Sequence, residues 1–469
     1  MNPGIVILGG GPTGIGAALR LLELGRHDFV LIDAAAAPGG LASSHCDAHG
    51  FTWDLGGHVQ FSHYRKFDEY MDLAFPSDGW LWHDRESWIW LRDRFIPYPF
   101  QNNLHRLDPA DQWRAVEGLL AAHRNPRCGP SDNFRDWILT TFGAGVADLF
   151  LFPYNLKVWA HPLEHMDCRW VGERVATPSL DEVLRAICLR QDQVSWGPNR
   201  RFRFPLRGGT GAVWRSLGQR IPHANLRMSS RVASIDAARR TVKLADGDEI
   251  RYQQLINTAP LDWLCRTVAV PGLARSADLK SSTVHVIGIG MRGQPPESLS
   301  KMCWMYFPGV ETSFYRVTVF SNYSPYNVPS PGATWSLMAE VSETEHFPKN
   351  SAQIVDDVIA QMTSIGLIPE AETILSRWHK ILTPGYPTPS LERDSILDQV
   401  LPLLEAREIY SRGRFGAWKY EVSNQDHSFM QGVEVADRIV LGRSEPTLHQ
   451  PDRVNRGYNS FPYAEEEAA

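Results

Sequence analysis

The pattern of apolar and polar positions is clearest in the first thirty-three residues. Residues 4–8 form a short apolar run that predicts a buried strand. Residues 15–22 carry apolar side chains at i, i+3, i+4 and i+7, which predicts a helix that ends at Gly25. Residues 29–32 are apolar again and predict a second strand ending at Asp33. The chain therefore begins with a strand, a glycine-rich turn, a helix and a strand.

The rest of the chain alternates between helical and strand patterns. Helices are predicted over residues 111–122, 133–142, 354–365 and 424–436. Strands are predicted over residues 51–55, 284–291, 302–307, 315–320, 335–341 and 438–443, with hairpins at 88–96 and around 246–247 and a double-proline turn at 385–389. The four strands between residues 284 and 341 indicate an antiparallel sheet, and residues 438–443 indicate a last strand that ends in glycine.

Composition and charge narrow the class of protein. The 469 residues are 43% hydrophobic and 21% charged, which is ordinary for a soluble protein of two or three domains. A net charge of −6 gives no reason to expect nucleic acid or an anionic membrane as partner. Apolar runs stay below the roughly 18 residues of a membrane span, and the N-terminus lacks a signal-peptide pattern. The six cysteines contain no C-x-x-C, so we expect no metal site and a reducing, cytoplasmic location.

A G-x-G-x-x-G pattern lies between the first strand and the first helix. Gly9, Gly11 and Gly14 permit a tight turn, a close backbone approach to a pyrophosphate and close packing of helix on strand. The helix N-terminus, which begins at Pro12 and Thr13, offers free N–H groups to that anion. Asp33 stands where a ribose hydroxyl is bound. The pattern predicts a dinucleotide site, and its alternative is a plain turn between strand and helix.

Two further glycine pairs change this picture. Gly39 and Gly40, followed by Leu41 and Ala42, are typical of flavin folds rather than nicotinamide folds, although a Pro-Gly-Gly turn is the simpler alternative. Residues 56–58 are a Gly-Gly-His loop in which the backbone is free to approach a ligand. By itself that histidine would be interpreted as an ordinary loop histidine. The glycine pairs favour FAD as the cofactor.

Two polar segments are candidates for substrate binding. Two prolines in residues 97–103 hold the backbone extended and present Tyr98, Phe100 and Gln101, which suit a nucleobase, whereas the alternative is a rigid surface turn. Residues 196–211 carry four arginines among glycines and prolines. They indicate either an anion-binding loop or a solvated basic face.

Longer stretches of the chain resemble one enzyme family. The matching stretches are residues 56–59, 61–64, 97–103, 153–160, 172–176, 196–199, 202–205, 207–211, 314–316, 320–327, 385–389, 411–416 and 424–430. In order and content they resemble the eukaryotic-type UDP-galactopyranose mutases. They cover most of the chain and are far more specific than the glycine motif.

The resemblance implies an isomerase that uses FAD without net redox change. Such enzymes interconvert UDP-galactopyranose and UDP-galactofuranose, and N5 of the reduced flavin forms a covalent adduct with the sugar as UDP leaves. FAD is therefore expected as cofactor, UDP-galactose and UDP-galactofuranose as substrates, and NAD(P)H as the reductant.

The resemblance also implies roles for particular residues. Arg174 and Arg316 would bind the diphosphate, for which a guanidinium fork is well suited. The carbonyl of His58, beside Gly57, would accept the flavin N5–H bond, and His63 would support it nearby. The remaining residues implied for the substrate are Tyr98, Phe100, Gln101, Asn155, Trp159, Asn199, Tyr306, Tyr323, Tyr420 and Gln450, and those implied for the cofactor include Gly442 and Asn455.

Two positions depart from the family pattern. Gln450, within His-Gln-Pro, replaces a tyrosine that contacts the diphosphate, so one phosphate hydrogen bond is expected to change. Gln60 replaces an apolar residue beside the flavin loop. Both changes leave the exact nucleotide sugar open.

The predicted architecture is α/β with three parts. A Rossmann-like FAD-binding domain comprises residues 1–75, 207–264 and 420–469; a helical substrate and uridine domain comprises 100–195; an antiparallel sheet domain comprises 76–99, 196–206 and 265–419. Competing hypotheses are an amine or protoporphyrinogen oxidase, a mutase for another nucleotide sugar, and a flavin-binding protein without turnover. Homo-oligomers are compatible with the sequence, which does not determine the subunit number.

Overall fold

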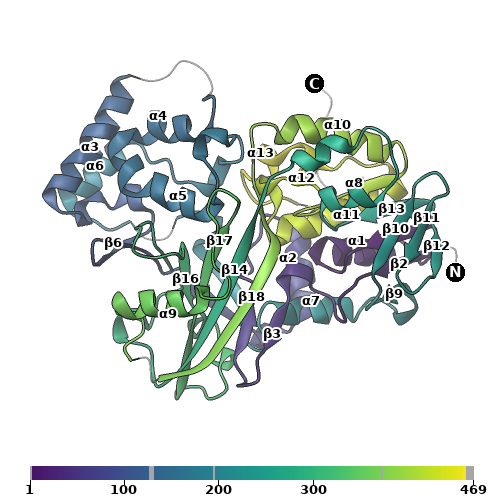
Figure 1. The fold of residues 1–469 in the computed structure, drawn as a ribbon, viewed down its shortest axis with the longest axis horizontal. Coiled ribbons are helices and arrows are strands. Elements are labelled where there is room, and N and C mark those ends of the chain that lie inside the picture. Colours follow the sequence, from purple (N-terminus) through teal and green to yellow (C-terminus); the bar gives the residue numbers. More distant parts are fainter. Residues whose placement is uncertain (1–2, 126–130, 194–195, 371–372, 461–469) are drawn as a thin grey trace.

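The computed structural model describes residues 3–125, 131–193, 196–370 and 373–460. Its first layer is a five-stranded parallel sheet in the order β19-β13-β1-β2-β9 (Figure 1). The strands are β1 (Ile5–Leu8), β2 (Phe29–Ile32), β9 (Leu226–Arg227), β13 (Gln254–Asn257) and β19 (Ile409–Ser411). Helix α1 (Pro12–Glu23) follows β1, so the predicted strand–turn–helix–strand unit is confirmed.

The last long helix, α11 (Gln425–Leu441), packs against α1. The predicted helix at 424–436 is confirmed, but the predicted strand at 438–443 is wrong. Residues Ile439 and Val440 continue α11 and pack against the core beside the parallel sheet. Gly442, with a φ of +71°, ends the helix as its C-cap and does not return the chain to a cofactor. The β-branched residues Ile439 and Val440 suggested a strand, but in the structure they lie on the face of helix α11 that packs against the core.

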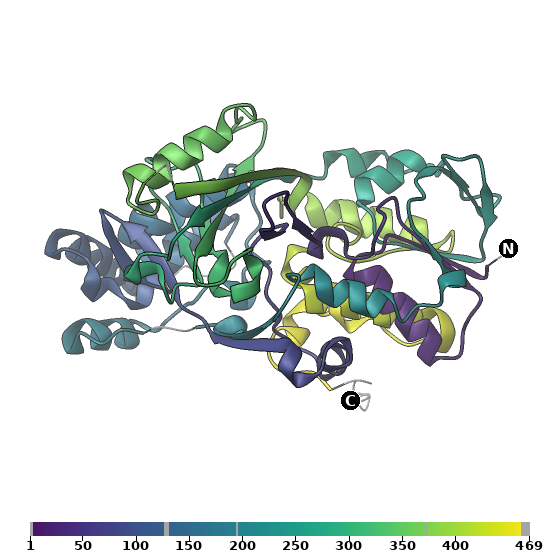
Figure 2. The same ribbon diagram turned by 90° about the horizontal axis from the view of Figure 1, so that it is seen from below.

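A seven-stranded sheet forms the centre of the molecule (Figure 2). Its order is β18 (Ile374–Pro387), β14 (Ser281–Arg292), β17 (Thr334–Glu343), β16 (Arg316–Val319), β15 (Trp304–Tyr306), β6 (Ser87–Leu91) and β7 (Arg94–Pro97). All pairs are antiparallel except β15 with β6. Helix α9 (Ile354–Ser364) packs on this sheet, so the predicted strands, hairpin and helix are confirmed.

Strand β18 corrects the prediction of a turn at residues 385–389. Its last residues are Gly385, Tyr386 and Pro387, and of these Tyr386 and Pro387 pair with β14. Because β18 is an edge strand, prolines that lack an N–H donor are tolerated there. Gly288 and Gly290 of β14 make room for buried aromatic rings, since an added Cβ would lie 2.6 Å from Trp53 and 2.6 Å from Phe51.

The helical domain lies to one side of the sheet (Figure 1). It comprises α3 (Pro109–Arg124), α4 (Phe134–Val146), α5 (Phe152–Trp159) and α6 (Leu180–Leu189). Asp108, Asn133 and Ser179 cap α3, α4 and α6 by accepting backbone N–H bonds, which explains where these helices begin. The predicted helices at 111–122 and 133–142 are therefore confirmed.

The helical stretch Phe134–Trp159 is long and apolar enough to cross a membrane by length and composition alone, although Gly143, with a φ of 71° and a ψ of 171°, interrupts its helical backbone. The stretch arises because α4 and α5 join through one π-helical turn (Ala147–Leu151), and charged residues such as Asp148 divide it into shorter apolar runs. Half of the apolar window is buried inside the protein. Helices in the core of folded domains meet the same criterion, and Phe134, Ile138 and Phe142 belong to such a core here.

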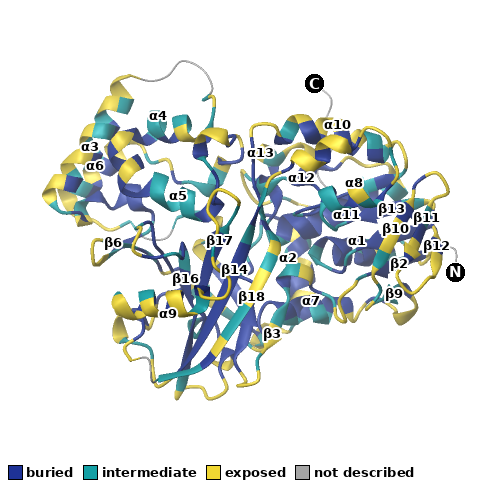
Figure 3. Ribbon diagram, in the orientation of Figure 1, coloured by how far each residue is buried: buried dark blue, intermediate teal, exposed yellow. Residues whose placement is uncertain are grey.

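The remaining elements connect the layers. They are β3 (Ser44–Cys46), β4 (Thr52–Asp54), β5 (Trp80–Asp84), β8 (Arg201–Pro205), β10 (Val232–Asp236), β11 (Thr241–Leu244), β12 (Glu249–Arg251), α2 (Arg65–Ala74), α7 (Gly211–Gly218), α8 (Leu261–Thr267), α10 (Arg393–Glu405), α12 (Pro446–His449) and α13 (Pro451–Val454). The predicted hairpin at 246–247 joins β11 to β12. Strand β19, expected within the sheet domain, instead pairs with β13, and α10 packs on β19. Buried residues line the interior of all three parts (Figure 3).

Candidate functional site

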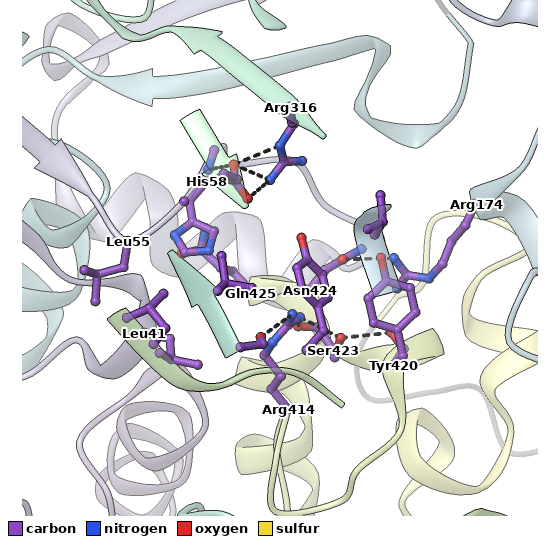
Figure 4. Close-up of a pocket in the computed structure, with 18 of the residues that line it drawn as sticks. Leu41, Leu55, His58, Arg174, Arg316, Arg414, Tyr420, Ser423, Asn424 and Gln425 are labelled. Carbon is purple, nitrogen blue, oxygen red and sulfur yellow. Dashed lines mark hydrogen bonds and ion pairs between the residues drawn. The ribbon is translucent and has the colours of Figure 1, made fainter. Parts of the chain in front are cut away.

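A cavity of about 770 Å³ lies where the three parts of the molecule meet. It extends from the glycine-rich turn after β1 to the helical domain, and Figure 4 shows its arginine-rich region. The predicted site residues that line it are Gly9, Gly11, Pro12, Thr13, Asp33, Gly40, Leu41, Ala42, Gly57, His58, Tyr98, Gln101, Asn155, Trp159, Arg174, Asn199, Tyr306, Arg316 and Tyr420. The fold thus brings most of the predicted residues into one space.

The glycine-rich end of the cavity has the shape that a dinucleotide requires. Gly9 has a φ of +104°, and a Cβ there would lie 2.2 Å from Thr258 Oγ1. Gly14 packs helix α1 so closely that a Cβ would lie 1.9 Å from the Gly9 carbonyl. No side chain caps the N-terminus of α1. These features leave backbone N–H groups facing a narrow cradle, which fits a pyrophosphate.

The acidic residue of this cradle is held in place by backbone donors. Asp33 accepts hydrogen bonds from the N–H of Gly10 at 2.6 Å and of Ala35 at 2.7 Å. Gly39 donates to the Gly10 carbonyl at 2.8 Å, so the second glycine pair is tied to the first. A carboxylate can accept further bonds, and a ribose hydroxyl is the donor this position suits.

Arg316 belongs to the sheet wall of the cavity and has a carboxylate partner of its own. It begins β16 and lies opposite Glu340 of β17 in the strand register. Its Nε and Nη2 donate to Glu340 at 2.9 and 2.8 Å (Figure 4). Glu340 also accepts from the N–H of Gly57 at 3.0 Å and from Tyr315 at 2.7 Å. These partners hold the pKa of buried Glu340 below its usual value, so the carboxylate stays ionised.

His58 lies beside this pair and is neutral. Burial lowers the pKa of His58 to about 4. Its Nδ1 is buried and has no hydrogen-bond partner within the described residues. The His58 carbonyl accepts from Thr210 Oγ1 at 3.2 Å and keeps a second lone pair for another donor.

Arg174 reaches the opposite wall from a single helical turn, Gly172–Arg174 (η7). Its Nη1 donates to Asn424 Oδ1 at 3.2 Å, and its Nη2 donates to the Glu421 carbonyl at 3.1 Å (Figure 4). The guanidinium lies 4.6 Å from the centre of the Tyr420 ring. Among the described residues no carboxylate pairs with it, so its charge is balanced only by neutral oxygens and an aromatic face.

Two more arginines, which the sequence analysis did not assign to the site, line the cavity. Arg414 is half-buried and donates to Ser423 Oγ at 2.9 Å and to the Gly385 carbonyl at 3.3 Å, and loss of hydration lowers its pKa. Arg85 donates to Asn199 and to the Trp196 carbonyl. Neither pairs with a carboxylate in the part of the chain that the structure describes. Arg414 lies within the matching stretch 411–416, which was the one available signal.

Aromatic and amide groups form the inner walls. Tyr98 lies 5.1 Å from Tyr306, centre to centre, and Trp159 lies 4.8 Å from Tyr420. Gln101 donates to the Ala176 carbonyl and so ties the segment after Arg174 to this wall. Further lining residues that sequence reasoning did not single out are Tyr154, Trp170, Glu173, Tyr315, Glu340, Tyr386 and Asn424.

Several predicted residues lie outside the cavity lining. Phe100 is stacked on Phe150 at 5.0 Å in the core, and Tyr323 is buried in an aromatic cluster with Phe204. Gln450 is exposed, accepts from Arg453 at 3.0 Å and lies outside the cavity lining. The others outside the lining are Gly14 and Gly39, which shape the glycine turn, Gly442 in the C-cap of α11, and His63 and Asn455, which line a second cavity.

The other departure from the family pattern is only partly satisfied locally, because Gln60 Oε1 is buried and has no hydrogen-bond partner among the described residues. Gln60 is buried and donates to Gln425 at 3.0 Å, while its backbone pairs with Arg203. Gln425 lines the cavity, so Gln60 acts on the site through that neighbour.

Comparison with known proteins agrees with this geometry. A family model described as flavin containing amine oxidoreductase matches residues 12–440, so the chain belongs to that class of flavoproteins. A solved structure of reduced UDP-galactopyranose mutase has 45% identity, covers 98% of each chain and gives a TM-score of 0.95. At that identity and coverage, the chain belongs to the UDP-galactopyranose mutase family.

Two other solved structures share the fold alone. A putative protoporphyrinogen oxidase from Exiguobacterium sp. 255-15 has 15% identity, covers 94% of this chain and 100% of its own, and gives a TM-score of 0.73. A fatty acid isomerase from P. acnes has 14% identity, covers 94% and 99%, and gives a TM-score of 0.65. FAD is the cofactor of this class, and the cradle after β1 fits it.

Proposed function

We propose that the protein interconverts UDP-galactopyranose and UDP-galactofuranose with FAD in its reduced form. The observation that carries the proposal is the set of Arg85, Arg174 and Arg414. Each lines the cavity and, among the described residues, donates hydrogen bonds only to neutral oxygens. Burying cations without a counter-charge is costly, so these residues indicate an anionic ligand beyond the dinucleotide. A nucleoside diphosphate sugar, with its aromatic base, suits the rest of the lining.

The reduced flavin, when bound, supplies a nucleophilic nitrogen for the anomeric carbon of the sugar. Arg174 and Arg316 are placed to stabilise the diphosphate as it leaves, with Arg414 as a third cation. Tyr98 and Tyr306 provide faces for the uracil ring. The neutral His58 side chain adds no charge near the flavin, and its carbonyl retains one free acceptor position.

Two segments exclude water from the reacting groups. The turn that carries Arg174 is tied to Gln101 through Ala176, and the 196–199 segment is tied to Arg85. Because both segments line the cavity, closure of them over a bound substrate would protect a hydrolysable sugar intermediate.

NAD(P)H is proposed as the reductant. Support comes from the resemblance and from the same arginines, which would also suit the pyrophosphate of a nicotinamide nucleotide. We also propose a cytoplasmic location, because NAD(P)H is available there and the cysteines are free where described.

The test is product analysis. Anaerobic protein reduced with dithionite or NAD(P)H is incubated with UDP-galactofuranose, and UDP-galactopyranose is separated by chromatography. Conversion is expected only with the reduced protein, so the oxidised protein serves as control. Absence of conversion under reducing conditions contradicts the proposal. A panel of other nucleotide sugars then defines the sugar that the enzyme prefers.

The runner-up is an oxidase of the amine oxidoreductase class, favoured only by the family model. It predicts oxygen consumption with amines or porphyrinogens and no effect of UDP. A steady-state oxygen electrode measurement with these substrates separates the two activities.

A further inference from the structure

His63 lies between two carboxylates that come from different parts of the fold. Its Nδ1 is 2.7 Å from Asp426 Oδ2, and its Nε2 is 2.8 Å from Glu173 Oε1. The backbone N–H of His63 also donates to Asp426 at 2.9 Å. Asp426 lies in the first turn of α11, where a negative charge is favoured by the helix dipole. The imidazole therefore bridges α11 and the turn Gly172–Arg174.

The turn itself has little other support. None of its three residues is buried, and Glu173 lines both the main cavity and a second cavity of about 690 Å³. With space on both sides, packing does not fix its position. Its side-chain anchors are the contacts of Arg174 with Asn424 and the Glu421 carbonyl, and the contact of Glu173 with His63.

Glu173 and Arg174 are neighbours of opposite charge, yet they do not pair with each other. Glu173 turns to His63, whereas Arg174 turns to Asn424 in the main cavity. An ion pair between the two would neutralise Arg174 and weaken its attraction for an anion. The bond to His63 keeps the carboxylate away from that guanidinium.

The same histidine belongs to a group that could by distance hold a metal ion. Donor atoms of His63, Asp426 and His427 lie within 4.8 Å of one another. Both ring nitrogens of His63, however, are already bound to carboxylates, and that arrangement requires a proton on each nitrogen. The group therefore fits an imidazolium between two acids better than a metal ligand.

We propose that His63, Glu173 and Asp426 form a positioning device that fastens the Arg174 turn to α11 and diverts Glu173 from Arg174. The inference rests on the proposed function insofar as the bound anion is the diphosphate of UDP. His63 is thus a positioning residue, since it acts on the ligand through Glu173 and Arg174.

The charges around His63 agree with this role. The groups that face it are Asp426 and His427 of α11 and Glu173 of the turn, with Arg174 beyond. The two carboxylates outweigh the effect of burial and raise the pKa of His63 to about 10. Burial lowers the pKa of the stacked His427 to about 3, so that ring adds no competing charge at neutral pH. His63 therefore stays protonated over the physiological range.

The first experiment measures the local stability of the turn Gly172–Arg174 without any added ligand. Hydrogen exchange of the holoenzyme is followed by mass spectrometry for the peptide covering residues 169–177. Glu173→Gln is expected to speed exchange there roughly five- to tenfold, because one anchor of the turn is lost. Exchange in β1 should stay unchanged, which shows that the fold is intact. Glu164→Gln, an exposed carboxylate in the same domain, is the matched control and should behave as wild type. Unchanged exchange in Glu173→Gln overturns the proposal.

The second experiment distinguishes the two effects of His63, which are to fasten the Arg174 turn to α11 and to keep Glu173 away from Arg174. UDP affinity is measured by calorimetry for His63→Gln, Glu173→Gln and the double variant. His63→Gln frees Glu173 to pair with Arg174 and should weaken UDP binding roughly tenfold, or about 1.4 kcal/mol. Glu173→Gln loses only the fastening and should weaken it roughly threefold. The double variant should match Glu173→Gln, because the competing carboxylate is gone.

The outcomes distinguish this inference from the proposed function. UDP affinity equal to wild type in His63→Gln, or a double variant as weak as His63→Gln, overturns the positioning role. If the wild-type protein binds no UDP at all, the proposed function fails, and the exchange measurement still decides whether the turn is fastened through Glu173.

Discussion

The two walls of the cavity differ in how their arginines and histidines are paired. On the sheet wall, the cation Arg316 has its own carboxylate in Glu340, and the nearby His58 is neutral. On the turn wall, the cation Arg174 contacts only neutral oxygens and the Tyr420 ring, while the nearby His63 is charged and binds the carboxylates of Glu173 and Asp426. On the sheet wall, the charge of Arg316 is balanced by Glu340 without a ligand. The turn wall is left with an unbalanced charge that an anion can neutralise.

This difference separates two tasks. A paired arginine between neighbouring strands is oriented before any ligand arrives, and it contributes to both stability and binding. An unpaired arginine on a turn contributes mainly to binding. Substitutions on the two walls should therefore change stability and catalysis in different proportions, which can be measured.

The largest combined effect is expected for Arg316→Ala. It leaves Glu340 buried without its cation, and stranding a buried charge typically costs about 3–5 kcal/mol. Thermal unfolding followed by circular dichroism should show a marked loss of stability, together with loss of mutase activity.

A double variant provides the control. Arg316→Met with Glu340→Gln removes both charges and should recover at least half of the lost stability while activity stays low. If Arg316→Ala unfolds at the wild-type temperature, the sheet wall does not have the structural role described above.

Arg174→Ala should affect catalysis with little effect on folding. The loss of a charged partner for the diphosphate is expected to lower kcat/KM, with a loss of transition-state stabilisation of about 2–4 kcal/mol. Since the side chain contacts only neutral oxygens, the unfolding temperature should remain close to that of wild type. Steady-state kinetics on the reduced enzyme and calorimetric unfolding test both statements; wild-type activity would refute the diphosphate assignment.

The histidine of the sheet wall gives a pH test. The pKa of His58 is near 6.5 when unfolded and about 4 when folded, so the unfolded state binds more protons between these values. Stability should therefore fall as pH drops from 6.5 to 4 and be independent of His58 above that range. In His58→Gln the loss over this interval should shrink by roughly 2–3 kcal/mol. Urea unfolding at several pH values measures it, with the exposed His123→Gln as control.

The smallest effect is expected for Arg414→Leu. Removing a half-buried cation without a carboxylate partner should leave the unfolding temperature equal or higher, because the desolvation cost of the charge disappears. The kcat/KM should fall roughly tenfold, about 1.4 kcal/mol, if Arg414 contacts the diphosphate. A clear loss of stability in this variant would place Arg414 with the structural cations of the sheet wall.

The sequence predicted the cofactor end of the cavity well. Gly9, Gly14 and Asp33 act through local backbone geometry, which short-range patterns report directly. The same G-x-G-x-x-G spacing recurs at Gly288 and Gly290 in β14 and at Gly293 directly after it, and the first two of these glycines face Trp53 and Phe51. Only the strand–turn–helix context distinguishes a ligand cradle from room for an aromatic ring.

Other features depended on distant partners and could not be inferred. The pairing of Arg316 with Glu340 follows from strand register, and the partners of Arg174 come from a segment about 250 residues away in sequence. Phe100 and Tyr323 matched the family pattern in type, yet they pack behind the lining. The apolar residues 439–441 satisfied a strand pattern, whereas the structure has them in α11, with Ile439 and Val440 packed against the core. Long-range packing decides such cases, and a linear pattern does not report it.

The segment 420–427 serves as the common anchor for several groups of the site. Tyr420, the Glu421 carbonyl and Asn424 receive Arg174, and Asp426 receives His63. For protein engineering, residues 420–427 and the turn Gly172–Arg174 are therefore a pair of segments that position each other. In a chimera that takes only one of these two segments from a homologue, both segments would be present, but the contacts that position them relative to each other would be lost. The two segments should therefore be exchanged together.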